Sequence, residues 1–197
     1  MKTIALTGNI CCGKTTVLKM FGKLGAETAS ADRIVEELYK KNKIKQILMK
    51  NFGKRVFSGK KIDKKKIADI IFSSRKERKK LESIVHAFVF REMKKRIARA
   101  RKKKKKLFVA EVPLLFESEK DFFSLFDFVC VVSAAKKQQI ARARKEGFSV
   151  REIRERMKVQ IPLEKKIKRA DFVVDNSGSV SETREQVKEV FWILTLT

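Results

Sequence analysis

The sequence predicts an α/β protein built on a five-stranded parallel sheet, because two hydrophobic patterns alternate along it. Five short apolar runs indicate buried strands, at residues 3–7, 27–29, 107–111, 126–132 and 172–174. Segments with apolar residues at helical spacing separate these runs. Strands that alternate with helices form parallel sheets with right-handed crossovers. The 197 residues and 43% apolar content suit a single compact unit with a sizeable core.

The first strand leads directly into a phosphate-binding loop. Residues 8–15 read Gly-Asn-Ile-Cys-Cys-Gly-Lys-Thr, and apolar residues at i, i+3, i+4 and i+7 from Val17 indicate a helix behind them. Strand, glycine-rich loop and helix together are the context in which this motif is a P-loop rather than a chance match. Its backbone N–H groups bind phosphate oxygens. We expect ATP as the ligand, with Lys14 on the β- and γ-phosphates and the Thr15 hydroxyl on Mg²⁺.

The second and third predicted strands are separated by a long helical stretch, residues 32–106. Its apolar stripes begin near Ile34, Ile44, Ile67 and Leu81, and they predict four helices. We therefore expect a nucleotide-binding core of residues 1–31 and 107–197, interrupted by an all-helical insert. By fold analogy with small-molecule kinases, such an insert binds the phosphate acceptor.

Two further helices, at Gln139–Lys145 and Val150–Gln160, are predicted with a hinge at Gly147. They are rich in arginine, and an arginine that closes over the γ-phosphate stabilises the charge that spreads across its oxygens. We expect residues 139–165 to form a helical lid, with Arg142 or Arg144 as its catalytic cation. Most of the arginines in this segment have the simpler interpretation of a solvated basic face.

Acidic residues end two of the predicted strands, at the edge of the sheet where ligands bind in open α/β folds. Asp32 follows the second strand and can accept the proton of an acceptor hydroxyl, or it can cap the helix that follows. Glu111 ends the third strand, where it can reach Mg²⁺ directly or through water, or bond to backbone amides.

Four other residues have chemistry that the sequence leaves open. Pro113 breaks the third strand and turns the chain over the site. His86, the single histidine, is more readily explained as a packed core residue than as a base. Cys11 and Cys12 supply small side chains to the loop, and nearby positive potential can lower a thiol pKa and favour oxidation.

The net charge of +26 has two interpretations. It can indicate a polyanionic partner such as nucleic acid, or a general lysine bias, which the even spread of lysine along the chain favours. No run approaches a membrane span, no signal peptide is evident, and three cysteines make no disulfide framework. We therefore expect a cytoplasmic protein without a membrane partner.

In several places the chain resembles the dephospho-CoA kinase family. Residues 4–16 are similar to its first strand and P-loop, 29–32 to its Asp-x-Asp segment, and 59–72 to its Gly-x-(x)-Ile-Asp-Arg stretch. Residues 81–86 resemble its Leu-Glu-x-Ile-x-His segment, and 112–117 match its Val-Pro-Leu-Leu-Phe-Glu. A series near the end keeps the family's spacing, at Gln160, Glu164, Lys166, 170–171 and 175–176. The P-loop is generic, whereas the last two matches are specific.

The resemblance implies a three-layer P-loop kinase core with a helical substrate-binding insert and a helical lid. The implied activity is transfer of the ATP γ-phosphoryl group to the ribose 3′-hydroxyl of dephospho-CoA, with Asp32 as catalytic base. It implies that the nucleotide contacts are Gly8, Asn9, Ile10, Cys11, Cys12, Gly13, Lys14, Thr15, Thr16 and Asn176. The implied substrate contacts are Asp32, His86, Glu111, Pro113 and Leu115.

The chain departs from the family pattern at several positions. Ser30 replaces the first aspartate of Asp-x-Asp, Glu36 an arginine, and Glu111 an aspartate, while Cys11 and Cys12 replace Gly-Ser. Two other function classes stay open: another P-loop nucleoside or nucleotide kinase, and a nucleic-acid-associated P-loop ATPase. We expect nucleic acid to be unnecessary for activity, and the protein to be a monomer or a weak oligomer.

Overall fold

The computed structural model describes residues 1–117, 120–158 and 160–196. The chain divides into two compact units. The first contains Met1–Ser30 and Arg96–Thr197, and the second contains Ala31–Lys95. The second unit ends at Lys95, inside a helix, whereas the sequence suggested that the insert ends at residue 106. That the core binds nucleotide and the insert binds the phosphate acceptor stays a prediction.

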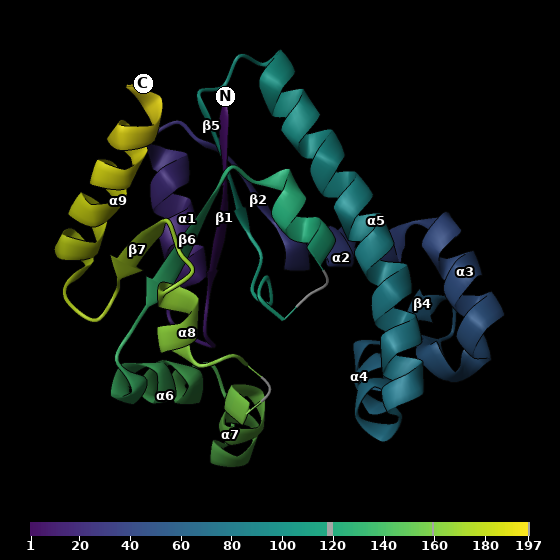
Figure 1. The fold of residues 1–197 in the computed structure, drawn as a ribbon. Helices are drawn as coiled ribbons and strands as arrows, with labels where there is room; N and C mark the ends of the chain where they lie inside the picture. The colour runs from purple at the N-terminus through teal and green to yellow at the C-terminus, as the bar shows by residue number, and fades with distance from the viewer. Residues whose placement is uncertain (118–119, 159, 197) are drawn as a thin grey trace. The chain divides into compact units, whose positions relative to one another are not determined.

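The first unit is built on the predicted five-stranded parallel sheet, in the order β2-β5-β1-β6-β7 (Figure 1). Its strands are β1 (Lys2–Gly8), β2 (Glu27–Ser30), β5 (Leu107–Glu111), β6 (Phe128–Ser133) and β7 (Phe172–Asp175). These five strands fall where the apolar runs predicted them. The central strand is therefore the one that leads into the phosphate-binding loop.

The register of the sheet brings the ends of these strands to one edge. Gly8 pairs with Val132 of β6, and Ser30 at the end of β2 pairs with Glu111 at the end of β5. Ser133 pairs with Asp175 at the end of β7. The loop after β1 thus begins at the same edge as Glu111 and the chain that follows Asp175.

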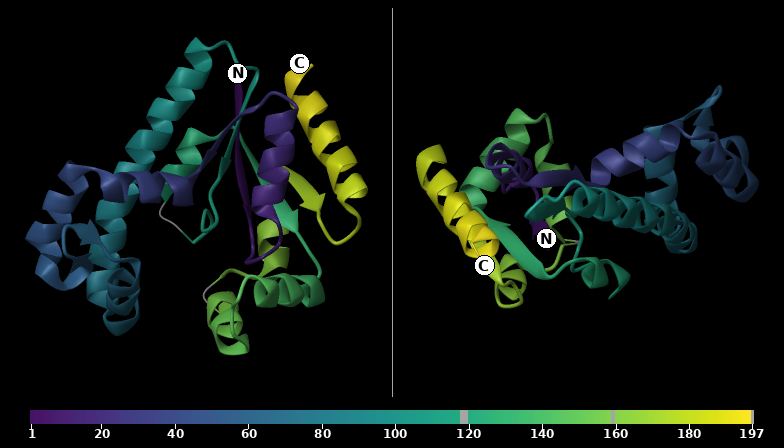
Figure 2. Two further views of the ribbon diagram at one scale, coloured as in Figure 1. Left: turned by 180° about the vertical axis from the view of Figure 1, so that it is seen from behind. Right: turned by 90° about the horizontal axis from the view of Figure 1, so that it is seen from above.

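Helices α1 (Lys14–Lys23) and α9 (Val180–Thr195) pack side by side along one face of the sheet (Figures 1 and 2). Their apolar stripes, with Val17, Phe21 and Val187 fully buried, meet alternate strand residues in one core cluster. The other strand residues, including Phe108 and Val131, point to the opposite face and are also fully buried. Both faces of the sheet are covered, as a parallel sheet requires.

Three further helices lie between β6 and β7: α6 (Lys136–Lys145), α7 (Val150–Lys158) and α8 (Leu163–Ile167). A 3₁₀ helix, η2 (Lys120–Leu125), precedes β6. The predicted helical pair is present, and Gly147 between α6 and α7 has φ of +88°, which favours glycine. The predicted end of the second helix at Gln160 includes residue 159, which lies outside the described residues.

The second unit contains α2 (Ala31–Lys40), α3 (Asn42–Phe52), η1 (Gly53–Val56), α4 (Lys64–Ser73) and most of α5 (Arg75–Lys102). The prediction of an all-helical segment is wrong at one place, because β3 (Phe57–Ser58) and β4 (Lys61–Ile62) form a short antiparallel hairpin. Gly59 in its turn has φ of +58°. Two-residue strands are too short to produce the alternating pattern by which a strand is recognised in sequence.

None of the helices in the described parts of the chain combines the length and the apolar character that a membrane crossing needs.

Candidate phosphate-binding site

Two glycines fix the path of the loop between β1 and α1. Gly8 has φ of +148° and Gly13 has φ of +92°. A Cβ atom on Gly8 would collide with the carbonyl oxygen of Val132, and one on Gly13 would collide with the side-chain amide of Asn176. Glycine is therefore required at both positions for close approach as well as for backbone conformation.

Lys14 begins α1, and its side chain folds over the loop. Its Nζ donates to the carbonyl oxygens of Gly8 (3.1 Å) and Asn9 (2.8 Å), and the residue is only 9% exposed. The backbone N–H groups of Lys14 and Thr15 lie in the first turn of α1, where no preceding helical carbonyl can accept them. The loop thus combines an ammonium group with helix N-terminal donors, the elements of an anion-binding site.

Thr15 and Glu111 lie together, as their positions after β1 and at the end of β5 suggested. The Thr15 hydroxyl donates to the Glu111 carboxylate, at 3.1 Å from Oε1 and 3.2 Å from Oε2. Glu111 is 6% exposed, so its carboxylate lies in the protein rather than in bulk solvent. A hydroxyl and a carboxylate at one point provide the hard oxygen ligands that Mg²⁺ prefers.

The carbonyl oxygen of Cys12 joins the loop to two distant elements. It accepts hydrogen bonds from Asn176 Nδ2 (2.8 Å) and from Arg142 Nη1 (3.3 Å). Arg142 Nη2 donates to the Asn176 carbonyl oxygen (2.9 Å), and Thr183 of α9 donates to Asn176 Oδ1 (3.1 Å). Asn176 and Arg142 therefore hold the loop in place in this structure.

The two candidate lid arginines differ sharply in their surroundings. Arg142 is half-buried and bonded to the loop, whereas the Arg144 side chain is exposed and makes no hydrogen bond or ion pair within the described residues. Of the other arginines, Arg156 stacks on Phe148, with 4.4 Å from guanidinium carbon to ring centroid. Which arginine meets a phosphate stays a prediction.

The expectation of a lowered thiol pKa in the loop is wrong. The pKa of Cys11 is raised to about 11, because the thiol is partly buried and because the Glu146 carboxylate lies 3.6 Å from its Sγ. Lys14 acts in the opposite direction but more weakly. Burial also raises the pKa of Cys12. The sequence indicates the neighbouring lysine, but it does not indicate the burial or the glutamate 135 positions away.

Cys11 should consequently be alkylated slowly. With a pKa of about 11 in place of about 9, the reactive thiolate at pH 7 is about a hundredfold scarcer. We expect the rate of reaction with iodoacetamide, followed by peptide mass mapping, to rise with pH up to about pH 11. Glu146→Gln should shift this curve to lower pH. A rate that levels off below pH 9 would contradict the assignment.

The remaining predicted substrate contacts lie in different settings. Pro113 is half-buried, and its carbonyl oxygen accepts a hydrogen bond from Thr7. Leu115 is fully buried, so the structure gives it a core position rather than a surface from which to contact a ligand. In the second unit, Asp32 is exposed in the first turn of α2, and His86 is half-buried on α5. Asp32 thus lies within the helix that the capping interpretation would have it precede.

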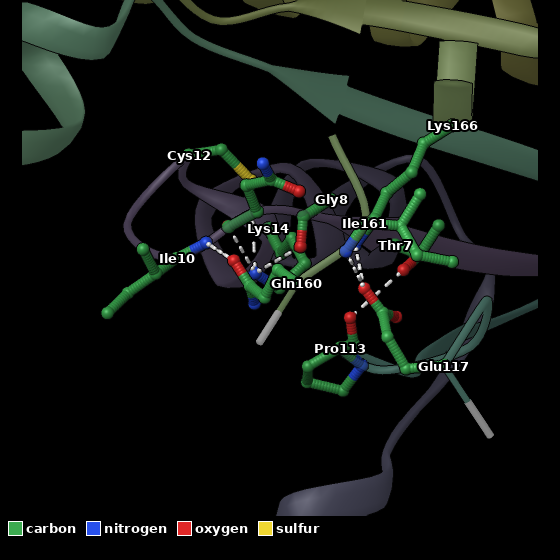
Figure 3. A network of polar contacts seen from close by, with 11 residues as sticks. Thr7, Gly8, Ile10, Cys12, Lys14, Pro113, Glu117, Gln160, Ile161 and Lys166 are labelled. Atoms are coloured by element: carbon green, nitrogen blue, oxygen red, sulfur yellow. Dashed lines mark hydrogen bonds and ion pairs between the residues drawn. The ribbon is translucent and has the colours of Figure 1, made fainter. Parts of the chain in front are cut away.

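Three residues near the loop were absent from the predicted site. Gln160 accepts the Ile10 N–H, and Glu117 forms an ion pair with Lys166, as Figure 3 shows. All three belong to segments that resemble the family, but sequence spacing alone gave no reason to place them beside the P-loop. A buried lysine near a glutamate is visible only when the fold is known.

A P-loop that leaves the central strand of a five-stranded parallel sheet, followed by a helical pair bonded back to it, places the protein among the P-loop kinases. The comparisons identify the family. A family model described as dephospho-CoA kinase matches residues 2–182, and the chain belongs to the dephospho-CoA kinase family. It is therefore a kinase that uses ATP and acts on a small molecule.

Individual relatives agree. The chain is 41% identical to the dephospho-CoA kinase of Aquifex aeolicus over 197 residues, which cover 99% of this chain and 98% of that protein. A solved protein from Thermus thermophilus is 30% identical, with a TM-score of 0.85 and 98% of both chains covered. The solved dephospho-CoA kinase of Campylobacter jejuni is 26% identical, with a TM-score of 0.67, and the match covers 100% of this chain and 98% of that one.

Proposed function

We propose that this protein transfers the γ-phosphoryl group of ATP to the ribose 3′-hydroxyl of dephospho-CoA, giving coenzyme A and ADP. The observation that carries the proposal is the pairing of Thr15 with Glu111 beside Lys14, in a chain of this family. It joins a metal-binding oxygen pair to a phosphate-binding loop, and phosphoryl transfer needs both.

On the nucleotide side, Lys14 and backbone amides within residues 8–16 bind the phosphates, apart from the Ile10 N–H, which donates to Gln160. Lys14 must exchange its bonds to the Gly8 and Asn9 carbonyl oxygens for bonds to phosphate oxygens. That exchange is favourable because a charged acceptor forms the stronger hydrogen bond. Asn176 supports the nucleotide site through the Cys12 carbonyl, and Arg142 does so from α6.

Thr15 and Glu111 would hold Mg²⁺. Their oxygens fit the ion, and no group of three or more metal-binding side chains occurs among the described residues. A site with one carboxylate and one hydroxyl is the kind that Mg²⁺ completes with water and nucleotide phosphates. When bound, the ion neutralises charge that develops on the transferring group.

Glu111→Gln should raise the Mg²⁺ concentration for half-maximal activity by about tenfold, because the amide loses the charge but keeps an oxygen for the Thr15 hydroxyl. Turnover measured against Mg²⁺ concentration tests this expectation. Glu185→Gln, an exposed glutamate on α9, is the matched control. An unchanged Mg²⁺ requirement would remove Glu111 from the metal site.

On the acceptor side, Asp32 accepts the proton of the 3′-hydroxyl as the phosphoryl group leaves ATP. His86 and Pro113 contact the substrate, whereas Leu115 is fully buried in the core. Either Arg142, which already bonds to the loop, or Arg144 supplies the cation that meets the γ-phosphate.

The test is incubation with ATP, Mg²⁺ and dephospho-CoA, with the product identified by mass. A gain of one phosphoryl group, located on the 3′-oxygen by fragmentation, supports the proposal. A panel of nucleosides, nucleotides and other small acceptors separates it from another kinase activity. ATP hydrolysis that is stimulated by nucleic acid, with no phosphorylated acceptor, would overturn it.

A further inference from the structure

The loop donates one hydrogen bond that the proposed chemistry does not use. The side-chain carbonyl of Gln160 accepts the backbone N–H of Ile10 at 3.0 Å (Figure 3). These residues are 150 positions apart, and Gln160 follows α7, the second helix of the predicted lid. One side chain thus joins the chain that returns from the lid to the middle of the phosphate-binding loop.

Gln160 is itself held by a buried anchor. The next residue, Ile161, donates its N–H to Glu117 Oε1 at 2.8 Å, and Lys166 Nζ lies 2.8 Å from the same oxygen. Lys166 is fully buried and the Glu117 side chain is 14% exposed. Breaking a buried ion pair is costly, because it leaves an uncompensated charge in the interior. The Glu117 carboxylate, held by Lys166, therefore restrains the backbone at Ile161, next to Gln160.

Ile10 lies in the loop next to a residue with an unusual backbone conformation. It directly precedes Cys11, which has φ of +51°, a conformation that non-glycine residues adopt infrequently. A loop with such a residue keeps one shape only if its surroundings impose it. The bond that Ile10 donates to Gln160 sets the direction of the Asn9–Ile10 peptide, one peptide before the one that ends in Cys11.

We propose that Gln160 is a positioning residue of the phosphate-binding loop: it orients the Ile10 peptide, and the Glu117–Lys166 pair orients Gln160. The loop is thereby arranged for phosphate before ATP arrives. The inference rests on the proposed function only in that the ligand of the loop is ATP.

Gln160→Met tests this proposal, because methionine has similar length and lacks the carbonyl acceptor. We expect amide hydrogen exchange at Ile10, followed by NMR, to be at least about tenfold faster in the variant. We expect the dissociation constant for ATP to rise about threefold to tenfold, the size of one lost neutral hydrogen bond. The value of kcat should change less than twofold, since the loss affects ground and transition states alike.

Two further variants make the result specific. Gln160→Glu keeps an oxygen that can accept the Ile10 N–H, so Ile10 exchange should stay at the wild-type rate. Gln46→Met, at an exposed position on α3, should leave both Ile10 exchange and ATP affinity unchanged.

The proposal is overturned if Ile10 exchanges equally fast in wild type and Gln160→Met. It is also overturned if Ile10 exchange accelerates while the ATP dissociation constant stays the same, since the bond would then be structural only. Wild-type protein that does not bind ATP would instead refute the proposed function, and Ile10 exchange would still report on the Gln160 bond.

Discussion

Replacing Asp32 with asparagine is expected to lower kcat on dephospho-CoA by about 10²–10³, within the range that a general base usually contributes. Asparagine keeps the size of the side chain but cannot accept a proton. The dissociation constant for ATP should stay nearly unchanged, because the proposed contacts to the triphosphate come from the loop and α1. Asp32 lies in the first turn of α2, and helix folding alone would tolerate asparagine there.

Single-turnover kinetics on Asp32→Asn, with ATP binding measured separately, provides the test. Asp69→Asn is the matched control, because Asp69 is an exposed aspartate on α4 in the same unit. Wild-type turnover in Asp32→Asn would remove Asp32 from the role of base. A comparable loss of kcat in Asp69→Asn would show that removing any negative charge from this unit lowers turnover.

Lys166→Met is expected to destabilise the protein by about 3–5 kcal/mol, because it leaves the Glu117 carboxylate largely buried without its cation. The neighbouring Lys165→Met, on an exposed face of α8, should change the free energy of unfolding by less than about 0.5 kcal/mol. Denaturant unfolding measures both values, provided that the transition is two-state.

A double variant separates the charge from the packing. Glu117→Gln combined with Lys166→Met removes both charges and keeps an oxygen for the Ile161 N–H, so most of the lost stability should return. A loss below about 1 kcal/mol in Lys166→Met alone would mean that water reaches the pair and screens it.

Much of the fold could be predicted because its signals are local. The apolar runs at β1, β5 and β6, and the glycine spacing of the loop, depend on residues that are close in sequence. The Thr15–Glu111 contact was also predictable in outline, since Glu111 ends β5 and Thr15 opens the helix after the loop that leaves the neighbouring parallel strand β1. The β3–β4 hairpin was not, because its strands are two residues long.

The features of the site that could not be predicted concern burial and long-range partners. The raised pKa of Cys11 depends on Glu146, which the fold brings from the end of α6. The bonds of Arg142 to Cys12 and Asn176 likewise depend on packing. Leu115 lies in a segment that is specific to the family, and the segment does not distinguish a residue that packs from one that contacts a ligand. Each of these outcomes required the three-dimensional structure.

The two bonds to the Cys12 carbonyl have a consequence for how the protein is made. Asn176, which holds the loop, follows Cys12 by 164 positions and is therefore synthesised well after it. Asn176 is held in turn by Thr183 on the final helix. A nascent chain therefore cannot assemble this arrangement until the residues up to Thr183 have left the ribosome. The loop is thus made well before the residues that hold its shape.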